Sequence, residues 1–378
     1  MTDMRTLLTL SAILLFCIPC PAETAPPSAD APRHLLYVAT PGIRNDFQYG
    51  GVGIVVFDID HEHHFLRRIP VPALGDRAHP EAVKGVCASA VTGKLYVSTT
   101  KNLNCLDLTT DKVLWEKTYD SGCDRMSIAP DGKFLYEPTL EGKYWHVIDA
   151  NNGDEIAKIV TDSGAHNTVY GPDGKHVFLA GLHSPVLTVA ETKTHTAEKT
   201  VGPFAAAIRP FTINGRSTVC YVCVNDLLGF EMGDLLTGKK LARVEVEGFS
   251  QGPTMRHGCP SHGVGLTPDE KEVWVTDAHN SRLHVFDNTV MPPKQVASIP
   301  LHDQPGWITF GIDGRYAYPS TGDVVDTKTR KVVVELKDET GAGVQSEKLL
   351  EIDFAGSKPL QAGDQFGVGR VVGASAGN

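Results

Sequence analysis

One pattern of apolar and polar positions recurs along the chain: an apolar run, a tight polar turn of the Asp-Gly-Lys kind, and a second run of apolar and aromatic residues. The second runs alternate Val, Ile, Tyr and Trp with other residues, which is typical of packed β-strands. A tight turn between two strands that returns many times predicts a repeat architecture. The clearest copies are 128–136 (IAPDGKFLY), 169–179 (VYGPDGKHVFL), 266–275 (LTPDEKEVWV) and 310–318 (FGIDGRYAY), and weaker copies occupy 89–97 and 211–220.

The turns return at the spacing of a four-stranded propeller blade. Successive turns are 39, 42, 41, 55 and 44 residues apart, counted between their second positions, and one blade takes about 40–45 residues. Each unit is predicted to run as inner strand A, tight turn, strand B, loop, strand C, second turn and strand D. The second positions are Thr92, Asp131, Asp173, Asn214, Asp269 and Asp313, and the third unit is predicted to hold strands at 125–129, 134–138, 144–149 and 155–160.

The two ends of the repeat region complement each other. The first unit offers only outer strands, at 34–40, 53–58 and 65–70, while 349–354 (LLEIDF) is an inner strand without partners. Pairing these strands closes the ring and removes both free edges. We therefore predict an all-β fold, a seven-bladed β-propeller of four-stranded antiparallel blades over residues 35–358, with residues 359–378 as a C-terminal tail.

The N-terminus has the features of an export signal. Arg5 precedes an apolar stretch at 7–18, and small residues follow near Ala22. A dozen apolar residues are too few for a membrane span, which takes roughly 20. The sequence predicts a signal peptide at 1–22, a disordered leader at 23–34, and a monomeric protein in the periplasm or outside the cell.

Charge and motifs exclude several classes of function. The net charge is −10 and the charged residues are scattered, which argues against nucleic acid or an anionic membrane as partner. The six cysteines after residue 22 show no framework spacing, so buried free thiols are expected. No dinucleotide fingerprint or Cys-x-x-Cys-His motif is present, so neither NAD nor haem is expected. One segment, 107–115, is similar to the tryptophan-bearing repeat of quinoprotein dehydrogenases, but a single copy does not predict a quinone cofactor (PQQ).

The chain resembles the YVTN-type seven-bladed β-propeller repeat family. The best stretch is 263–287 (GVGLTPDEKEVWVTDAHNSRLHVFD), supported by the third, fourth and seventh units. The resemblance implies the fold over most of residues 35–358. It leaves function open, because the family includes binding proteins, lyases, lactonases and redox enzymes.

The repeat also locates one mouth of the central channel. In a propeller of this strand order, the loops from strand D to A and from strand B to C lie on one face, and strand A begins at the channel rim. The predicted rim positions are not equivalent among the blades, and two long loops, 40–51 and 249–261, could build walls over them. The rim positions are Gly85, Asp124, His166, Ala207, His262, Gly306 and Leu349, followed by Arg125, Asn167 and Trp307, with Lys84 and Arg209 close by; His79, His183, His257, His279 and His302 fall on the same face.

Three hypotheses fit this mouth. In the first, it binds a small anionic, carbohydrate-like ligand and acts as a lyase or hydrolase, or as a lactonase: Arg125 and Arg209 hold a carboxylate, and His166, His262 or Tyr49 moves protons. Further ligand contacts are expected from Asn167, His183, His257, His279 and Trp307. In the second, a divalent metal ion is bound by residues drawn from His79, Asp124, His166 and His262. In the third, the protein is a non-catalytic interaction module of the cell envelope.

Overall fold

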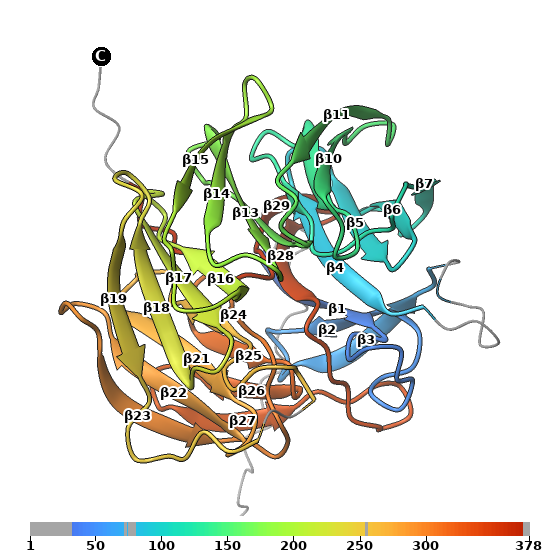
Figure 1. Ribbon diagram of the computed structural model, residues 1–378. Helices are drawn as coiled ribbons and strands as arrows, with labels where there is room; N and C mark the ends of the chain where they lie inside the picture. Colours follow the sequence, from blue (N-terminus) through green and yellow to red (C-terminus); the bar gives the residue numbers. More distant parts are fainter. Residues whose placement is uncertain (1–31, 72–73, 75–80, 254–255, 373–378) are drawn as a thin grey trace, which may run out of the picture.

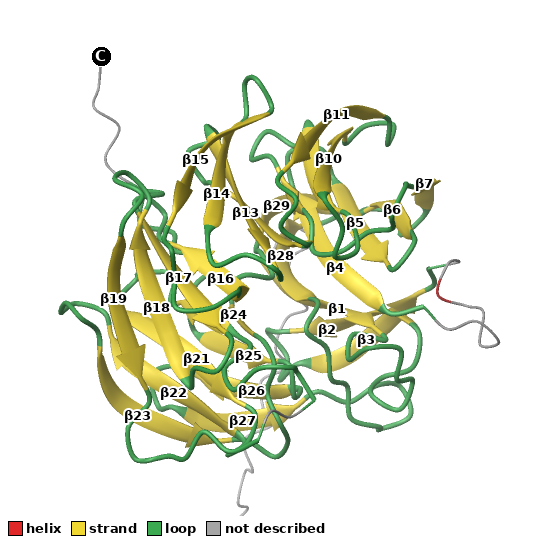
Figure 2. Cartoon of the chain, in the orientation of Figure 1, coloured by secondary structure: helices red, strands yellow, loops and turns green. Residues whose placement is uncertain are grey.

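Seven antiparallel sheets surround one central axis (Figure 1). The computed structural model describes residues 32–71, 74, 81–253 and 256–372, and strands joined by loops make up most of them (Figure 2). Six sheets have four strands in simple sequence order. The predicted seven-bladed β-propeller is confirmed.

The six four-stranded blades are, in chain order, β4 (Val83–Ser89), β5 (Lys94–Thr99), β6 (Asn102–Asp107) and β7 (Val113–Thr118); β8 (Ser127–Ile128), β9 (Phe134–Pro138), β10 (Tyr144–Asp149) and β11 (Glu155–Val160); β12 (Ala165–Tyr170), β13 (His176–Gly181), β14 (Leu187–Glu191) and β15 (Thr196–Val201); β16 (Ile208–Ile213), β17 (Val219–Val224), β18 (Gly229–Asp234) and β19 (Lys240–Glu245); β20 (Val264–Leu266), β21 (Glu272–Asp277), β22 (Arg282–Asp287) and β23 (Lys294–Pro300); and β24 (Ile308–Phe310), β25 (Tyr316–Pro319), β26 (Asp323–Asp326) and β27 (Lys331–Glu335). The seventh blade has the order β29 (Lys358–Ala362), β28 (Leu349–Ala355), β1 (Pro32–Thr40), β2 (Gly53–Asp58) and β3 (His64–Ile69).

The seventh blade closes the ring as the sequence predicts. β28 pairs with β1 in antiparallel register, with Leu35 opposite Ile352 and Val38 opposite Leu349. Each inner strand also contacts the next, from β28 through β4, β8, β12, β16, β20 and β24 back to β28. Closure thus gives β1 and β28, the strands at the two ends of the repeat region, a partner in each other.

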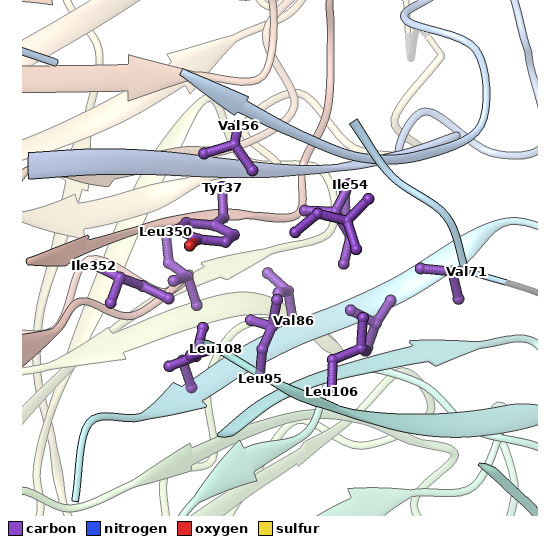
Figure 3. Packing of buried hydrophobic residues seen from close by; sticks show 14 of the residues in the cluster. Tyr37, Ile54, Val56, Val71, Val86, Leu95, Leu106, Leu108, Leu350 and Ile352 are labelled. Atoms are coloured by element: carbon purple, nitrogen blue, oxygen red, sulfur yellow. The ribbon is translucent and has the colours of Figure 1, made fainter. Parts of the chain in front are cut away.

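The core consists of apolar layers between neighbouring blades. Figure 3 shows one of these layers, in which Tyr37, Ile54 and Leu350 of the closing blade pack against Val86 and Leu95 of the next. Alternate residues of each strand point to opposite faces, so one blade contributes to two layers. The six cysteines after residue 22 are all buried and free, as expected.

The chain after β28 continues into the channel. β29 pairs with β28 on its inner side and contacts β4. The next residues, 363–370, which we call the channel plug, cross the channel. Gln365 Oε1 accepts a hydrogen bond from Val86 N at 2.9 Å on β4, and Gly367 O accepts one from Leu266 N at 2.8 Å on β20.

The plug ties further blades together. Thr212 on β16 donates a hydrogen bond to Gly367 O at 2.8 Å, and Trp307, which precedes β24, donates one from Nε1 to Gln365 O. The ring of Phe366 lies 5.8 Å from that of Trp307. The segment predicted as a tail is therefore built into the propeller as far as residue 370.

No helix within the described residues is long and apolar enough to cross a bilayer. The predicted signal peptide at 1–22 lies outside the described residues.

One buried carboxyl on β28 makes stability depend on pH. Burial, together with the neighbouring carboxylates of Asp353 and Asp313, raises the pKa of Glu351 from 4.5 to about 8. The folded state thus keeps a proton that the unfolded chain releases above pH 4.5, and this stabilisation is lost as pH rises through 8. We expect Glu351→Gln to be more stable than wild type at pH 9 by roughly 1 kcal/mol or more, while glutamine still accepts the hydrogen bond from Ile312 N at 2.7 Å.

Urea unfolding at pH 6 and pH 9 measures this difference. The exposed Glu245, changed to glutamine, is the control and should leave the pH dependence of wild type unaltered. If Glu351→Gln retains the same loss of stability between the two pH values, Glu351 is not the group responsible.

Candidate functional site at the channel mouth

All seven inner strands bring a polar or aromatic side chain to one mouth of the channel. Each such residue lies at the start of its strand or just before it, where the strand leaves the rim. Because the strands belong to different blades, residues far apart in sequence meet here. They are Lys84 on β4, Asp124 and Arg125 before β8, His166 on β12, Arg209 on β16, His262 before β20, Trp307 before β24, and Glu347 and Lys348 before β28.

A cavity of about 260 Å³ opens at this mouth, and positive charge dominates its lining. Six cationic side chains contribute, against the two carboxylates of Glu141 and Glu347. The whole chain carries a net charge of −10, so the cavity is an electropositive site on an acidic protein. The six are Arg44, Lys84, Arg125, Arg209, Arg256 and Lys348.

Glu347 is the hub of the buried charges. Its Oε2 accepts hydrogen bonds from Arg125 Nη2 at 2.6 Å and Lys348 Nζ at 2.7 Å, and its Oε1 faces His257 Nδ1 at 2.7 Å. Burial would raise the pKa of Glu347, but Lys348, His257 and Arg125 outweigh it and hold the pKa well below its usual value. Burial also lowers the pKa of Lys348 to about 8, with Glu347 opposing the shift. At neutral pH both groups are charged.

Asp124 and His166 form a second buried pair. His166 Nδ1 lies 2.6 Å from Asp124 Oδ2, and Arg125 Nη1 donates to His166 Nε2 at 3.1 Å. Burial lowers the pKa of His166 despite the carboxylate beside it. Burial would raise the pKa of Asp124, but His166 and Lys84 bring it down to about 2. An ionised Asp124 therefore holds a neutral His166 with its proton on Nδ1.

Arg125 connects the Asp124–His166 pair with Glu347. Its guanidinium contacts both Asp124, at 3.2 Å, and Glu347, and lies 4.8 Å from the ring centre of Trp307. Trp307 in turn packs against the ring of His262 at 6.1 Å. These contacts fix the arginine side chain.

A third group, His257, His262 and Glu347, could hold a metal ion. One ligand atom from each of these buried residues lies within 4.8 Å of the others. Burial lowers the pKa of His262 well below its usual value, so its imidazole is neutral, as metal binding requires. Gly306 makes room for this group, since a Cβ there would lie 2.0 Å from His257 Nδ1.

The two long loops meet at the mouth. Arg44, from the loop after β1, donates a hydrogen bond from Nη2 to Arg256 O at 2.8 Å. Arg256 stacks on the ring of Tyr49, 5.2 Å from its centre, and pairs with Asp303 at 2.9 Å. Tyr49 thus supports an arginine of the lining and is not itself among the lining residues.

The predicted site residues separate into two groups. Arg125, His166, Arg209, His257 and His262 line the cavity, with Asp124 and Trp307 directly behind them.

The others lie elsewhere. His183 and His279 are exposed and pack over Gly164 and Gly252, outside the lining. Asn167 is fully buried, and its amide has no hydrogen-bond partner among the described residues. His79 lies outside the described residues.

The sequence reasoning missed Glu347 and Lys348. The rim position assigned to the closing blade was Leu349, which is buried as the first residue of β28. A signal was present, because two charged residues immediately precede this apolar inner strand. The group that could hold a metal shares His262 with the predicted ligands and draws its other members from His257 and Glu347.

Comparisons with known proteins agree with the fold and give no function. No family model and no curated protein matches the chain. A chain in the crystal structure of the mitotic checkpoint complex is similar, with a TM-score of 0.60 and 14% identity, over 84% of this chain and 96% of that one. A chain of Kuenenia stuttgartiensis hydrazine synthase matches with a TM-score of 0.44 and 14% identity, over 63% of this chain and 92% of that one, which is too weak to support an argument. The likeness shows a β-propeller fold alone.

Proposed function

We propose that the protein binds a small anion bearing a carboxylate, such as a sugar acid, at the channel mouth. The observation that supports this is the concentration of six cationic side chains in a cavity of about 260 Å³ on an acidic protein. Clefts lined by one sign of charge attract ligands of the other. Arginine side chains also match carboxylates in geometry.

Arg209 is the best placed side chain to receive the ligand. Its Nε donates to Asn225 Oδ1 at 2.6 Å, and no hydrogen bond is seen from its two terminal nitrogens to any other described residue. Arg125, by contrast, is already engaged by Asp124, His166 and Glu347. We therefore assign the first contact with the carboxylate to Arg209 and a positioning role to Arg125.

Arg209→Gln is expected to weaken carboxylate binding about 10- to 100-fold, since it removes a charge-assisted, two-pronged contact worth about 1.5–3 kcal/mol. Isothermal titration with glucuronate, and with glucose as the uncharged counterpart, measures the loss. Arg216→Gln is the matched control, because Arg216 is exposed on an A–B turn at the opposite face. Equal affinity in wild type and Arg209→Gln would rule out this assignment, and no binding of any uronate, lactone or phosphate would refute the proposed function.

A second candidate function, a lyase or hydrolase, is favoured by the Asp124–His166 pair. The pair holds a neutral imidazole whose Nε2 accepts a hydrogen bond from Arg125 Nη1. If a ligand draws Arg125 away, Nε2 becomes a free proton acceptor. Turnover of uronate oligomers or lactones that disappears in His166→Gln would support catalysis. Anion binding without turnover across such a panel would leave a binding protein.

The remaining identifications are proposals from the sequence. We propose that the protein is exported to the periplasm or beyond, on the strength of residues 1–22, and that its repeats place it in the YVTN-type family. A non-catalytic envelope interaction module is the alternative. It is favoured if envelope proteins bind the mouth and small anions do not.

A further inference from the structure

The two oxygens of Glu347 face different kinds of partner. Oε2 is held by the cations Arg125 and Lys348 at 2.6 and 2.7 Å. Oε1 faces the histidines, 2.7 Å from His257 Nδ1 and 3.9 Å from His262 Nδ1. The carboxylate is thus anchored through one oxygen, while the other contacts His257 directly and lies near the ring of His262.

Both imidazoles are oriented by backbone carbonyls. His262 Nδ1 donates to Gly306 O at 2.9 Å, which leaves Nε2 with its lone pair. His257 Nε2 lies 3.2 Å from Gln304 O, which orients Nδ1 toward Glu347. A backbone carbonyl opposite the second ring nitrogen is the usual support of a metal-binding histidine, because it fixes both the tautomer and the ring.

We propose that His257, His262 and Glu347 bind one divalent metal ion of the zinc class, and that a carboxylate of the anionic ligand occupies the coordination position they leave open. Two imidazoles and one carboxylate are a donor set that zinc uses at sites with an open position. Around a tetrahedral zinc with bonds near 2.0 Å the ligand atoms lie about 3.3 Å apart. The 2.7 Å contact between His257 and Glu347 must therefore widen, and the longer spacings, up to 4.8 Å, must contract. The metal replaces the direct hydrogen bond between His257 and Glu347. The second half of the proposal rests on the anion-binding function proposed above, while the first half does not.

The surrounding charge couples the two ligands. Arg125 and Lys348, on Oε2 of Glu347, oppose a bare cation beside them. An anion that enters the cavity offsets this repulsion and donates an oxygen to the metal. Because such coupling is reciprocal, the anion must strengthen metal binding by the same factor by which the metal strengthens anion binding.

The metal half is tested with the full-length protein after removal of metals by a chelator. Titration with Zn²⁺, followed by dialysis and elemental analysis, should give one zinc per chain. His262→Ala and His257→Ala should each lose it, and His61→Ala should retain it, since His61 pairs with Asp58 at the surface. Circular dichroism checks that each variant is folded. No stoichiometric zinc in wild type, or zinc retained in both folded variants, would overturn the proposal.

The anion half is tested by titrating glucuronate into the protein with and without Zn²⁺. The zinc-loaded protein should bind at least about tenfold more tightly, and the visible absorption of the Co²⁺-substituted protein should change on addition of glucuronate. Equal affinities for glucuronate with and without Zn²⁺, together with an unchanged Co²⁺ spectrum, would overturn the proposal that the anion occupies the open coordination position. Glucuronate binding by a protein that takes up no zinc would overturn the metal centre and leave the proposed function intact. Zinc uptake without glucuronate binding would overturn the proposed function and leave the metal centre intact.

Discussion

Replacing Glu347 with alanine is expected to lower the free energy of unfolding by about 3–5 kcal/mol, which is typical when one partner of a buried charge network is removed. Arg125 and Lys348 are both buried and both donate to Glu347. Without the carboxylate their charges remain in the interior, partly compensated by Asp124, His166 and Trp307 around Arg125 and by Gly42 O at Lys348. Urea denaturation followed by circular dichroism measures the change.

Two variants show whether charge is the cause. Glu347→Gln keeps the shape of the side chain and should recover only part of the loss, because it lacks the charge. Glu339→Ala is the matched control, since Glu339 also binds an arginine through two hydrogen bonds, to Arg68, but at the surface. Surface ion pairs contribute about 0–1 kcal/mol. Similar losses in Glu347→Ala and Glu339→Ala would show that Glu347 is not the hub of a buried network.

Replacing Phe366 with alanine is expected to lower the free energy of unfolding by about 3–5 kcal/mol. Phe366 is 3% exposed and packs with Ile208, Phe211 and Trp307 in one apolar cluster. The channel plug that carries it connects β4, β16 and β20, so a loosened plug affects several blades together. The same denaturation experiment measures the loss.

The variant should also bind anions more weakly, because Phe366 supports Trp307 and Trp307 supports Arg125. Val372→Ala, at an exposed position just beyond the plug, should change neither property. If Phe366→Ala has the same free energy of unfolding as Val372→Ala, the plug contributes little to the stability of the propeller. If it is destabilised but binds glucuronate normally, the plug and the cavity are energetically independent.

The sequence predicted the fold well because the repeat is local. In the blade of β8 to β11, three strands have the predicted bounds: 134–138, 144–149 and 155–160. The inner strand was predicted at 125–129 but is only Ser127–Ile128. The physical reason is that Arg125 N donates to His166 O of the next blade, and Asp124 N donates to Glu137. The polar rim residues thus bond to the neighbouring blade and to a side chain of β9 instead of extending the backbone ladder between β8 and β9.

The site was less accessible to prediction because its contacts cross blades. Counting back from the tight turns located Asp124, His166 and His262, whose blades follow the common register. The same count placed the rim of the closing blade at Leu349 and so passed over Glu347. No local pattern links Glu347 with His257, which lies 90 positions away in another blade and contacts it at 2.7 Å.

The channel plug has a consequence for what can enter the mouth. Gln365 and Phe366 lie in the channel against Trp307, and no plug residue lines the cavity itself. A polymer that threaded the channel along its axis would have to displace the plug, which is hydrogen-bonded to β4, β16 and β20. We therefore expect ligands to enter and leave the cavity by the mouth and not from the opposite face of the propeller.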